Sequence, residues 1–313
     1  MLDPDIRRLL DSLFSVPSWT DKPDIAQLRA GTEAAAKLLG GAPANVEDVR
    51  DACAPGQACD VPVRIYRPAS ASPLPLVLFA HGGGWVTGSL DSHDRLCRIL
   101  ANALDSVVVA VDYRLAPEHA YPAALDDVAT AWRWARERPR ELGADGSRFA
   151  VAGDSSGGNL AAALTLRLAR ERVPQPDLQL LLYPALDAGC TRASYREFAS
   201  GYNLSATQMA WYWNAYRGGA DPQDAEMCPL AAEDLAGLPS AVIAVASADV
   251  LRDDGIDYAR ALEAAGVAVR VVECGGMIHG FLRWTGQVAA ARCWIEVIAD
   301  AARAMAWPRT SAA

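Results

Sequence analysis

Three residue types in this 313-residue chain have the spacing needed for acyl transfer. Ser155 lies in a Gly-x-Ser-x-Gly pentapeptide, between an apolar run of strand length (148–152) and an alanine- and leucine-rich helical pattern (159–172). Such a bend presents the serine hydroxyl beside a helix N-terminus, which favours developing negative charge. Because a non-catalytic Gly/Ser-rich turn would match the same pentapeptide, the nucleophile hypothesis depends on further groups.

A glycine-rich loop supplies the first of these groups. The sequence His81-Gly82-Gly83-Gly84-Trp85 directly follows a continuous apolar run at 74–80. Glycines leave backbone N–H groups open to a ligand, and main-chain donors of this kind form oxyanion holes. A flexible loop is the alternative, but three consecutive glycines upstream of the serine turn favour an oxyanion hole.

An acid and a base complete the set. Asp249 and His279 each follow a predicted strand, and the order Ser, Asp, His is that of hydrolases built on a parallel α/β sheet. Asp253 and Asp254 compete for the role of the acid. We favour Asp249 because it lies immediately beyond the strand, whereas the other two begin a helix, where carboxylates suit the helix dipole. His279 lies in a glycine-bordered loop, and a structural role is expected of the other histidines.

The elements that must position these residues alternate between strand and helix. Strand-like runs occur at 61–66, 74–80, 106–113, 148–152, 178–184, 241–246 and 267–272, with helical patterns between most of them and from 287 onward. This alternation predicts an α/β fold with a mostly parallel central sheet and helices on both faces. Ligands are then expected at the carboxyl ends of the strands.

Two segments do not fit the sheet pattern and predict a helical cap. Residues 1–40 repeat apolar side chains at helical spacing, including Leu13 and Phe14, and residues 187–226 are rich in aromatics. We therefore divide the chain into a first cap part (1–50), a core with the oxyanion loop and serine turn (51–186), a cap insertion (187–226) and a core with the acid and base (227–313). Ordinary packing helices are the alternative. An apolar substrate wall is predicted from the aromatic residues Trp85, Tyr183, Tyr195, Phe198 and Trp213.

Composition excludes several other classes. The net charge of −9 argues against a nucleic-acid binder, and no apolar run reaches the roughly 20 residues that span a membrane. The acidic N-terminus lacks the order of a signal peptide, so we expect a cytoplasmic protein. Seven cysteines without metal-site spacing are expected to be free thiols, and no metal or organic cofactor is called for. Lysine scarcity and abundant alanine favour a bacterial source.

Taken together, the motifs resemble those of the bacterial hormone-sensitive-lipase-like esterases, the family IV carboxylesterases of the α/β-hydrolase superfamily. The resemblance covers roughly residues 60–300 and depends on the motifs at 81–85, 112–118, 153–159, 249–253 and 279–281. Two positions depart from the usual pattern: Ser156 replaces an alanine and Val250 a proline. Neither change removes a reacting group, because Ser156 would act through its backbone N–H.

This resemblance implies a serine carboxylesterase that hydrolyses short- to medium-chain esters through an acyl-enzyme. Ser155 would attack, His279 would take its proton, and Asp249 would hold the imidazole. Backbone N–H groups of Gly83, Gly84 and Ser156 would bind the oxyanion. The family also implies a homodimer paired through a sheet edge. A non-catalytic receptor on the same fold, or a lactonase, deacetylase or amidase with the same triad, are the alternatives.

Overall fold

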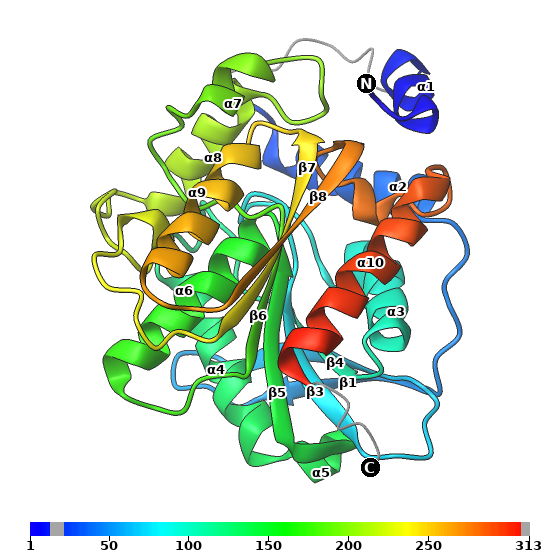
Figure 1. The fold of residues 1–313 in the computed structure, drawn as a ribbon, viewed down its shortest axis with the longest axis vertical. Coiled ribbons are helices and arrows are strands. Elements are labelled where there is room, and N and C mark those ends of the chain that lie inside the picture. Colours follow the sequence, from blue (N-terminus) through cyan, green and yellow to red (C-terminus); the bar gives the residue numbers. More distant parts are fainter. Residues whose placement is uncertain (13–21, 308–313) are drawn as a thin grey trace.

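A computed structural model describes residues 1–12 and 22–307 of the chain, and within them a single twisted sheet runs through the molecule (Figure 1). Its strand order is β1-β2-β4-β3-β5-β6-β7-β8. The first two pairings, β1 with β2 and β2 with β4, are antiparallel, and every other pairing is parallel. The predicted mostly parallel sheet is therefore confirmed. The strands are β1 (Asp48–Ala54), β2 (Val61–Arg67), β3 (Leu74–Ala80), β4 (Val107–Val111), β5 (Ala144–Asp154), β6 (Leu178–Leu182), β7 (Ser240–Ala248) and β8 (Val269–Ile278).

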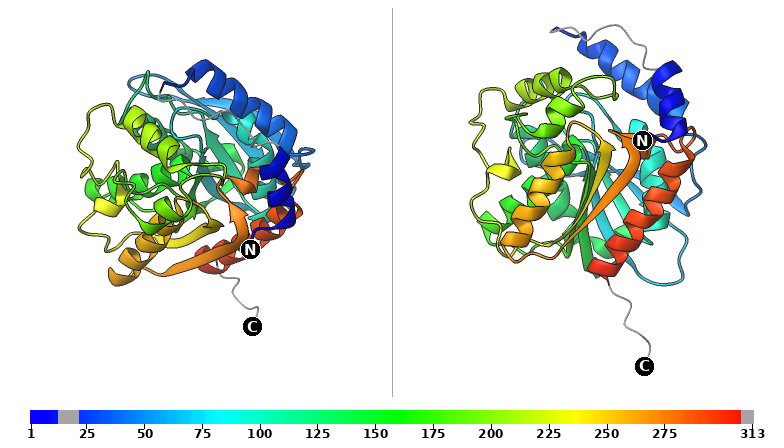
Figure 2. Two further views of the ribbon diagram at one scale, coloured as in Figure 1. Left: turned by 90° about the horizontal axis from the view of Figure 1, so that it is seen from above. Right: turned by 45° about the horizontal axis from the view of Figure 1, so that its top comes forward.

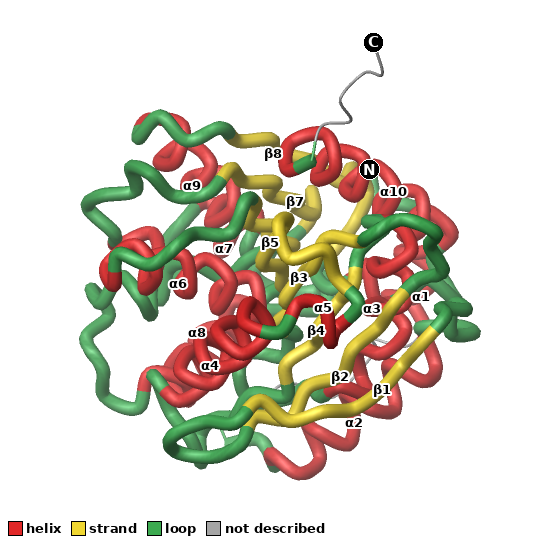
Figure 3. Tube along the Cα trace, turned by 90° about the horizontal axis from the view of Figure 1, so that it is seen from below, coloured by secondary structure: helices red, strands yellow, loops and turns green. Residues whose placement is uncertain are grey.

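Helices cover both faces of the sheet. Figures 2 and 3 place α3 and α10 on one side of the strands, and α4, α6 and α9 on the other. Since both faces are covered, the central strands need apolar side chains in both directions, which explains their unbroken hydrophobic runs. These helices are α3 (Leu90–Ala103), α4 (Ala123–Glu137), α6 (Ser156–Glu171), α9 (Arg252–Ala264) and α10 (Ala289–Ala306); the short α5 (Pro139–Leu142) precedes β5.

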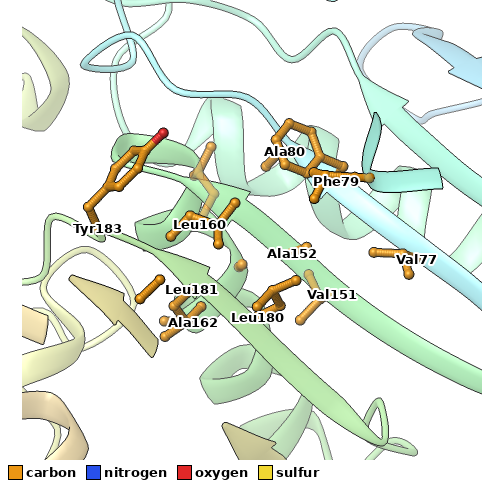
Figure 4. Packing of buried hydrophobic residues seen from close by; sticks show 14 of the residues in the cluster. Val77, Phe79, Ala80, Val151, Ala152, Leu160, Ala162, Leu180, Leu181 and Tyr183 are labelled. Atoms are coloured by element: carbon orange, nitrogen blue, oxygen red, sulfur yellow. The ribbon is translucent and has the colours of Figure 1, made fainter. Parts of the chain in front are cut away.

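The core is centred on β3, β5 and β6. Every residue of β3, β4 and β6 is buried. Figure 4 shows buried side chains around this centre, among them Phe79 of β3, Val151 of β5, Leu180 of β6 and Leu160 of α6. The strands and helix that flank Ser155 are thus held in the most densely buried part of the molecule, which fixes the bend between them.

Four helices lie at the end of the sheet toward which the arrows of β7 and β8 point (Figure 1). Figure 2 shows the N-terminal pair, drawn in blue, at the same end of the molecule as α7 and α8. Hydrogen bonds to side chains cap three of them: Asp3 accepts from the N–H of Asp5 at the start of α1, Asp24 accepts from Gln27 at the start of α2, and Ser205 pairs with Gln208 at the start of α8. The four are α1 (Pro4–Ser12), α2 (Ile25–Leu39), α7 (Ala193–Glu197) and α8 (Ala206–Arg217).

The element boundaries differ from the sequence prediction in several places, most of all at β1 and β8. Strand β1 is not predicted, because Asp48, Arg50 and Asp51 interrupt any apolar pattern and only Ala54 is buried on this edge, which pairs only with β2. Strand β8 runs to Ile278, beyond the predicted 267–272, because its backbone continues through Gly275 and Gly276. Helix α9 begins at Arg252, so Asp253 and Asp254 lie in its first turn, as predicted. Residues 13–21, which include Leu13 and Phe14 of the predicted first helix, lie outside the described residues.

Within residues 1–12 and 22–307, no helix has both the length and the apolar character that crossing a membrane requires.

Candidate active site

The turn from β5 to α6 holds Ser155 in a strained backbone conformation. Its φ and ψ angles are 57° and −118°, in a region that residues with side chains rarely occupy. A β-carbon on Gly153 would collide with the carbonyl of Gly157, and one on Gly157 with the carbonyl of Ala80. Both glycines are therefore required for the strand and helix to pass each other, and the serine is left at the helix N-cap.

Ser155, His279 and Asp249 form one hydrogen-bonded chain. The Nε2 atom of His279 lies 2.9 Å from Oγ of Ser155, and its Nδ1 atom lies 2.7 Å from Oδ2 of Asp249. Asp249 is 1% exposed, and its other oxygen accepts a hydrogen bond of 3.0 Å from the N–H of Leu251. The carboxylate is thus held on two sides, and the imidazole has one orientation that serves both partners.

The structure separates Asp249 from the two aspartates that compete with it in the sequence. Asp253 accepts a hydrogen bond from the N–H of Ser194 and pairs with Arg252. Asp254 is fully buried and accepts from the N–H groups of Leu186 and Asp187. Burial raises the pKa of Asp254 to about 8. Both residues anchor the segment after β6 to α9, and neither faces His279.

The glycine loop after β3 turns its backbone toward Ser155. Gly83 and Gly84 have φ angles of 130° and 61°, and both line the same cavity as Ser155. The carbonyl of Gly83 accepts hydrogen bonds from the N–H groups of Val86 and Thr87. Within the described residues, the N–H groups of Gly83 and Gly84 donate to no protein acceptor, so they are open to a ligand.

Asp154, the residue before the serine, connects the turn to this loop. Its Oδ1 atom accepts a hydrogen bond of 2.8 Å from the N–H of Gly82 and lies 3.2 Å from Nε2 of His93. Burial opposes the charged form, but His93, Arg283 and the Gly82 N–H stabilise it, so its pKa falls to about 2. The structural role expected of His93 is confirmed, whereas that of Asp154 was not predicted, although Asp154 stands inside the serine motif.

A cavity of about 610 Å³ opens onto Ser155 and His279. Its walls come from α2 on one side and from α8 with its preceding loop on the other. Most of its lining residues are apolar or uncharged: Leu28, Thr32, Ala35, Leu39, Asn203, Leu204, Gln208, Met209, Tyr212 and Trp284, with Asp24, Asp154 and Arg283 as charged members. A cavity of this size accommodates a small ligand beside the serine.

Comparison with known proteins agrees with this geometry. The sequence profile of a family described as the alpha/beta hydrolase fold matches residues 77–283. The chain belongs to the α/β-hydrolase family. The match begins in β3 and ends at Arg283, so it includes the oxyanion loop, the serine turn and His279.

Proteins named as esterases align with this α/β-hydrolase over most of their length. It is 43% identical over 291 residues to "Carboxylic ester hydrolase LipN" of Mycobacterium tuberculosis, covering 90% of this chain and 77% of the relative. It is 44% identical to "Ethyl acetate hydrolase" of Pseudomonas putida, covering 71% of this chain and 72% of the relative. A crystallised esterase from the archaeon Pyrobaculum calidifontis superposes with a TM-score of 0.91 at 36% identity, covering 97% of this chain and 99% of that one.

The predicted aromatic wall is wrong for this α/β-hydrolase. Trp85, Tyr183, Tyr195, Phe198 and Trp213 are all buried, and none lines the catalytic cavity. The Trp85 ring stacks on Tyr216 at 4.3 Å between centroids and lies 4.4 Å from Trp213. These large rings gain more by packing together, where they fix α8 to the oxyanion loop, than by facing solvent in a cavity.

Tyr183 lies behind the reacting groups. Its ring meets the His279 imidazole edge-on, at 5.0 Å between centroids, and it is 1% exposed. The aromatic residues of the cavity wall are instead Tyr212 and Trp284. Tyr212 could not be predicted from the sequence, because residues 211–213 are three consecutive aromatics on α8 and only packing decides which of them faces the cavity.

Among the residues that the structure describes, no group of three or more His, Cys, Asp and Glu side chains is arranged to hold a metal ion. All seven cysteines are free, as expected.

Proposed function

We propose that Ser155, His279 and Asp249 are the nucleophile, general base and orienting acid of a serine carboxylesterase. The observation that carries this proposal is the continuous hydrogen-bonded chain from Asp249 through His279 to Ser155, with separations of 2.7 and 2.9 Å, facing the open N–H groups of Gly83 and Gly84. A serine hydroxyl is a weak nucleophile until a base accepts its proton, and the imidazole is positioned to do so.

Acylation follows from this geometry. The Oγ atom of Ser155 attacks the ester carbonyl while its proton passes to Nε2 of His279, and Asp249 stabilises the imidazolium that forms. The carbonyl oxygen becomes an oxyanion that accepts hydrogen bonds from the N–H groups of Gly83, Gly84 and Ser156. Loss of one such donor typically costs roughly 3 kcal/mol in the barrier. The imidazolium then protonates the departing alcohol, leaving an acyl group on Ser155.

Deacylation repeats these steps with water. His279 takes a proton from a water molecule that attacks the acyl carbonyl, and the same N–H groups bind the second oxyanion. Collapse of this intermediate breaks the bond to Oγ, and the serine recovers its proton from His279. The carboxylic acid leaves, and the enzyme returns to its starting state.

The chain is a carboxylic ester hydrolase, as its relatives are by name. A non-catalytic receptor on the same fold is not favoured, because the histidine that such a receptor would have lost stands within hydrogen-bond distance of Ser155. Lactone, amide and acetyl-group hydrolysis would use the same three residues, and no feature of the cavity favours them over ester hydrolysis.

We propose esters with short or medium acyl chains as substrates, and α2 and α8 as two parts of a cap over them. The support is a cavity of about 610 Å³ whose walls are formed by these helices, with apolar contacts from Leu28, Leu39 and Met209. An extended long acyl chain would have to leave the cavity for water, which removes its favourable burial.

A series of p-nitrophenyl esters from acetate to palmitate tests both proposals, with Ser155→Ala as the blank. We expect kcat/KM to be highest at short or medium length and the alanine variant to show only background hydrolysis. Fastest turnover on the longest chains would overturn the substrate class. Activity that persists in a folded Ser155→Ala variant would overturn the catalytic assignment.

A further inference from the structure

A cationic side chain, Arg283, lies in the wall of the catalytic cavity. It ends the short 3-10 helix η2 (Phe281–Arg283), four residues after His279. A β-carbon placed on Gly280 would be 3.3 Å from Nη2 of Arg283. The guanidinium therefore lies against the backbone that directly follows the general base.

Within residues 1–12 and 22–307, Arg283 forms no ion pair, and its buried Nε atom has no hydrogen-bond partner. Several buried or partly buried arginines are matched with carboxylates: Arg64 with Asp51 and Asp91, Arg167 with Asp126 and Glu226, Arg192 with Asp187 and Asp257. Two others have different partners, since Arg95 donates to the Gly41 carbonyl and Arg136 lies over the rings of Trp132 and Phe149. Leaving a partly buried charge without a partner is costly. Such a cation in a ligand cavity suggests that the ligand supplies the anion.

The acidic groups around the cavity already have partners. Asp154 accepts from the Gly82 N–H and faces His93, and Asp249 is held by His279 and Leu251. Asp24 caps the start of α2 through a hydrogen bond of 3.1 Å from the N–H of Gln27. Arg283 is near enough to Asp154 to stabilise its charge, but it does not bond to it. Its Nη groups bond to no acceptor within the described residues and remain available to a molecule bound in the cavity.

We propose that Arg283 binds a carboxylate of the substrate, so that this enzyme prefers esters that carry a free carboxylate, such as monoesters of dicarboxylic acids. The planar guanidinium matches a carboxylate with two parallel hydrogen bonds, which a neutral ester cannot accept in the same way. This inference rests on the proposed esterase function, because it names the substrate class of the same cavity.

Two substrates of equal acyl length test the proposal. Monoethyl glutarate carries a carboxylate where ethyl pentanoate carries a methyl group, and ethanol release measures turnover of both. For Arg283→Gln we expect the ratio of kcat/KM, charged ester over neutral ester, to fall roughly 10- to 100-fold, as befits loss of a charged hydrogen bond. Arg283→Lys keeps the charge and should retain more of the ratio than Arg283→Gln.

The matched control is Arg292→Gln, which removes an exposed arginine of α10 and should leave the ratio as in the wild type. An Arg283→Gln ratio within twofold of the wild type would overturn the proposal. If that variant does not fold, competitive inhibition of the wild-type enzyme decides: glutarate must inhibit more strongly than 1,5-pentanediol, a neutral compound of equal length that is not an ester, and equal or weaker inhibition overturns the proposal.

Failure of the esterase function would look different. If the wild type hydrolyses ethyl pentanoate but Arg283→Gln leaves the kcat/KM ratio of charged to neutral ester unchanged, the esterase function stands and the carboxylate preference is wrong. If neither ester is hydrolysed, the esterase function falls, and calorimetric binding of glutarate to the wild type and to Arg283→Gln then tests Arg283 alone. Weaker binding to the variant supports its role, and equal binding contradicts it.

Discussion

The carboxylate of Asp154 accepts a hydrogen bond of 2.8 Å from the N–H of Gly82, and so joins the residue before the nucleophile to the residue before the oxyanion donors. This hydrogen bond therefore holds the serine turn and the oxyanion loop together, and both must contact the substrate carbonyl. The position of Ser155 relative to Gly83 and Gly84 depends on this contact as well as on the two strands.

Substitution of Asp154 should disturb the oxyanion loop. Asp154→Ala leaves the buried Gly82 N–H unpaired, which costs about 1–3 kcal/mol of stability. Asp154→Asn keeps an acceptor for Gly82 but removes the charge that faces His93, so it should lower Tm and kcat less than the alanine variant. An alanine variant with the Tm and kcat of the wild type would contradict the role given to this contact.

Asp249→Asn should reduce kcat roughly 10⁴-fold, as loss of the orienting charge does in serine hydrolases. The amide no longer stabilises the imidazolium, while substrate binding is untouched, so KM should change little. Asp253→Asn is the matched control, since Asp253 bonds to Ser194 and Arg252 rather than to His279. Equal losses of kcat in the two variants would contradict the assignment of Asp249 as the orienting acid.

Gly84→Ala should lower kcat by about 10²–10³-fold through loss of one oxyanion donor. A β-carbon at this position collides with the Tyr212 ring, and the φ of 61° is unfavourable for alanine, so the backbone must turn its N–H away. Gly237→Ala separates strain from function, because Gly237 has a φ of 74° and no atom within 4 Å of the added carbon. The control should lose stability without a matching loss of kcat.

Asp254 makes stability depend on pH. Burial raises its folded pKa from 3.8 to about 8, so the folded protein keeps a proton that the unfolded chain releases. Stability therefore falls as pH rises from about 4 to about 8, by up to about 1.4 kcal/mol per pH unit. Asp254→Asn removes this pH-dependent contribution to stability. The Tm of the variant relative to that of the wild type should therefore rise as pH increases from about 4 to about 8.

The control has the opposite sign. Hydrogen bonds and the charge of Arg252 outweigh burial and lower the pKa of Asp253, so its contribution to stability is complete above its ordinary pKa and is lost in acid. Asp253→Asn should accordingly be less stable than the wild type by a constant amount from pH 5 to 8. A Tm difference for Asp254→Asn that does not change with pH would show that its pKa is not raised.

The sheet and the three catalytic candidates could be predicted because each depends on local sequence. Buried parallel strands are continuous apolar runs, and Ser155, Asp249 and His279 each follow one of them, so one edge of the sheet must collect all three. The glycines at 153 and 157 indicate the bend in the same way, since no other residue fits there.

The cavity wall could not be predicted, because it depends on packing between distant segments. Trp213 and Tyr212 are neighbours on α8, yet one packs under Trp85 and the other lines the cavity. Arg283 lies just beyond the motif that identified His279, and only the structure shows that its buried Nε atom has no hydrogen-bond partner within the described residues. The cap and core boundaries, cytoplasmic location and homodimer remain predictions from the sequence.

Reaction with diethyl p-nitrophenyl phosphate tests the central claim most directly, because only an activated nucleophile beside an oxyanion hole is phosphorylated rapidly. Intact-mass and peptide analysis should find one diethylphosphoryl group, on Ser155, with release of one p-nitrophenol per chain. His279→Ala should react far more slowly, and folded Ser155→Ala should not react at all. Labelling of another residue in the wild type, or equal labelling of the Ser155→Ala variant, would contradict the catalytic role of Ser155.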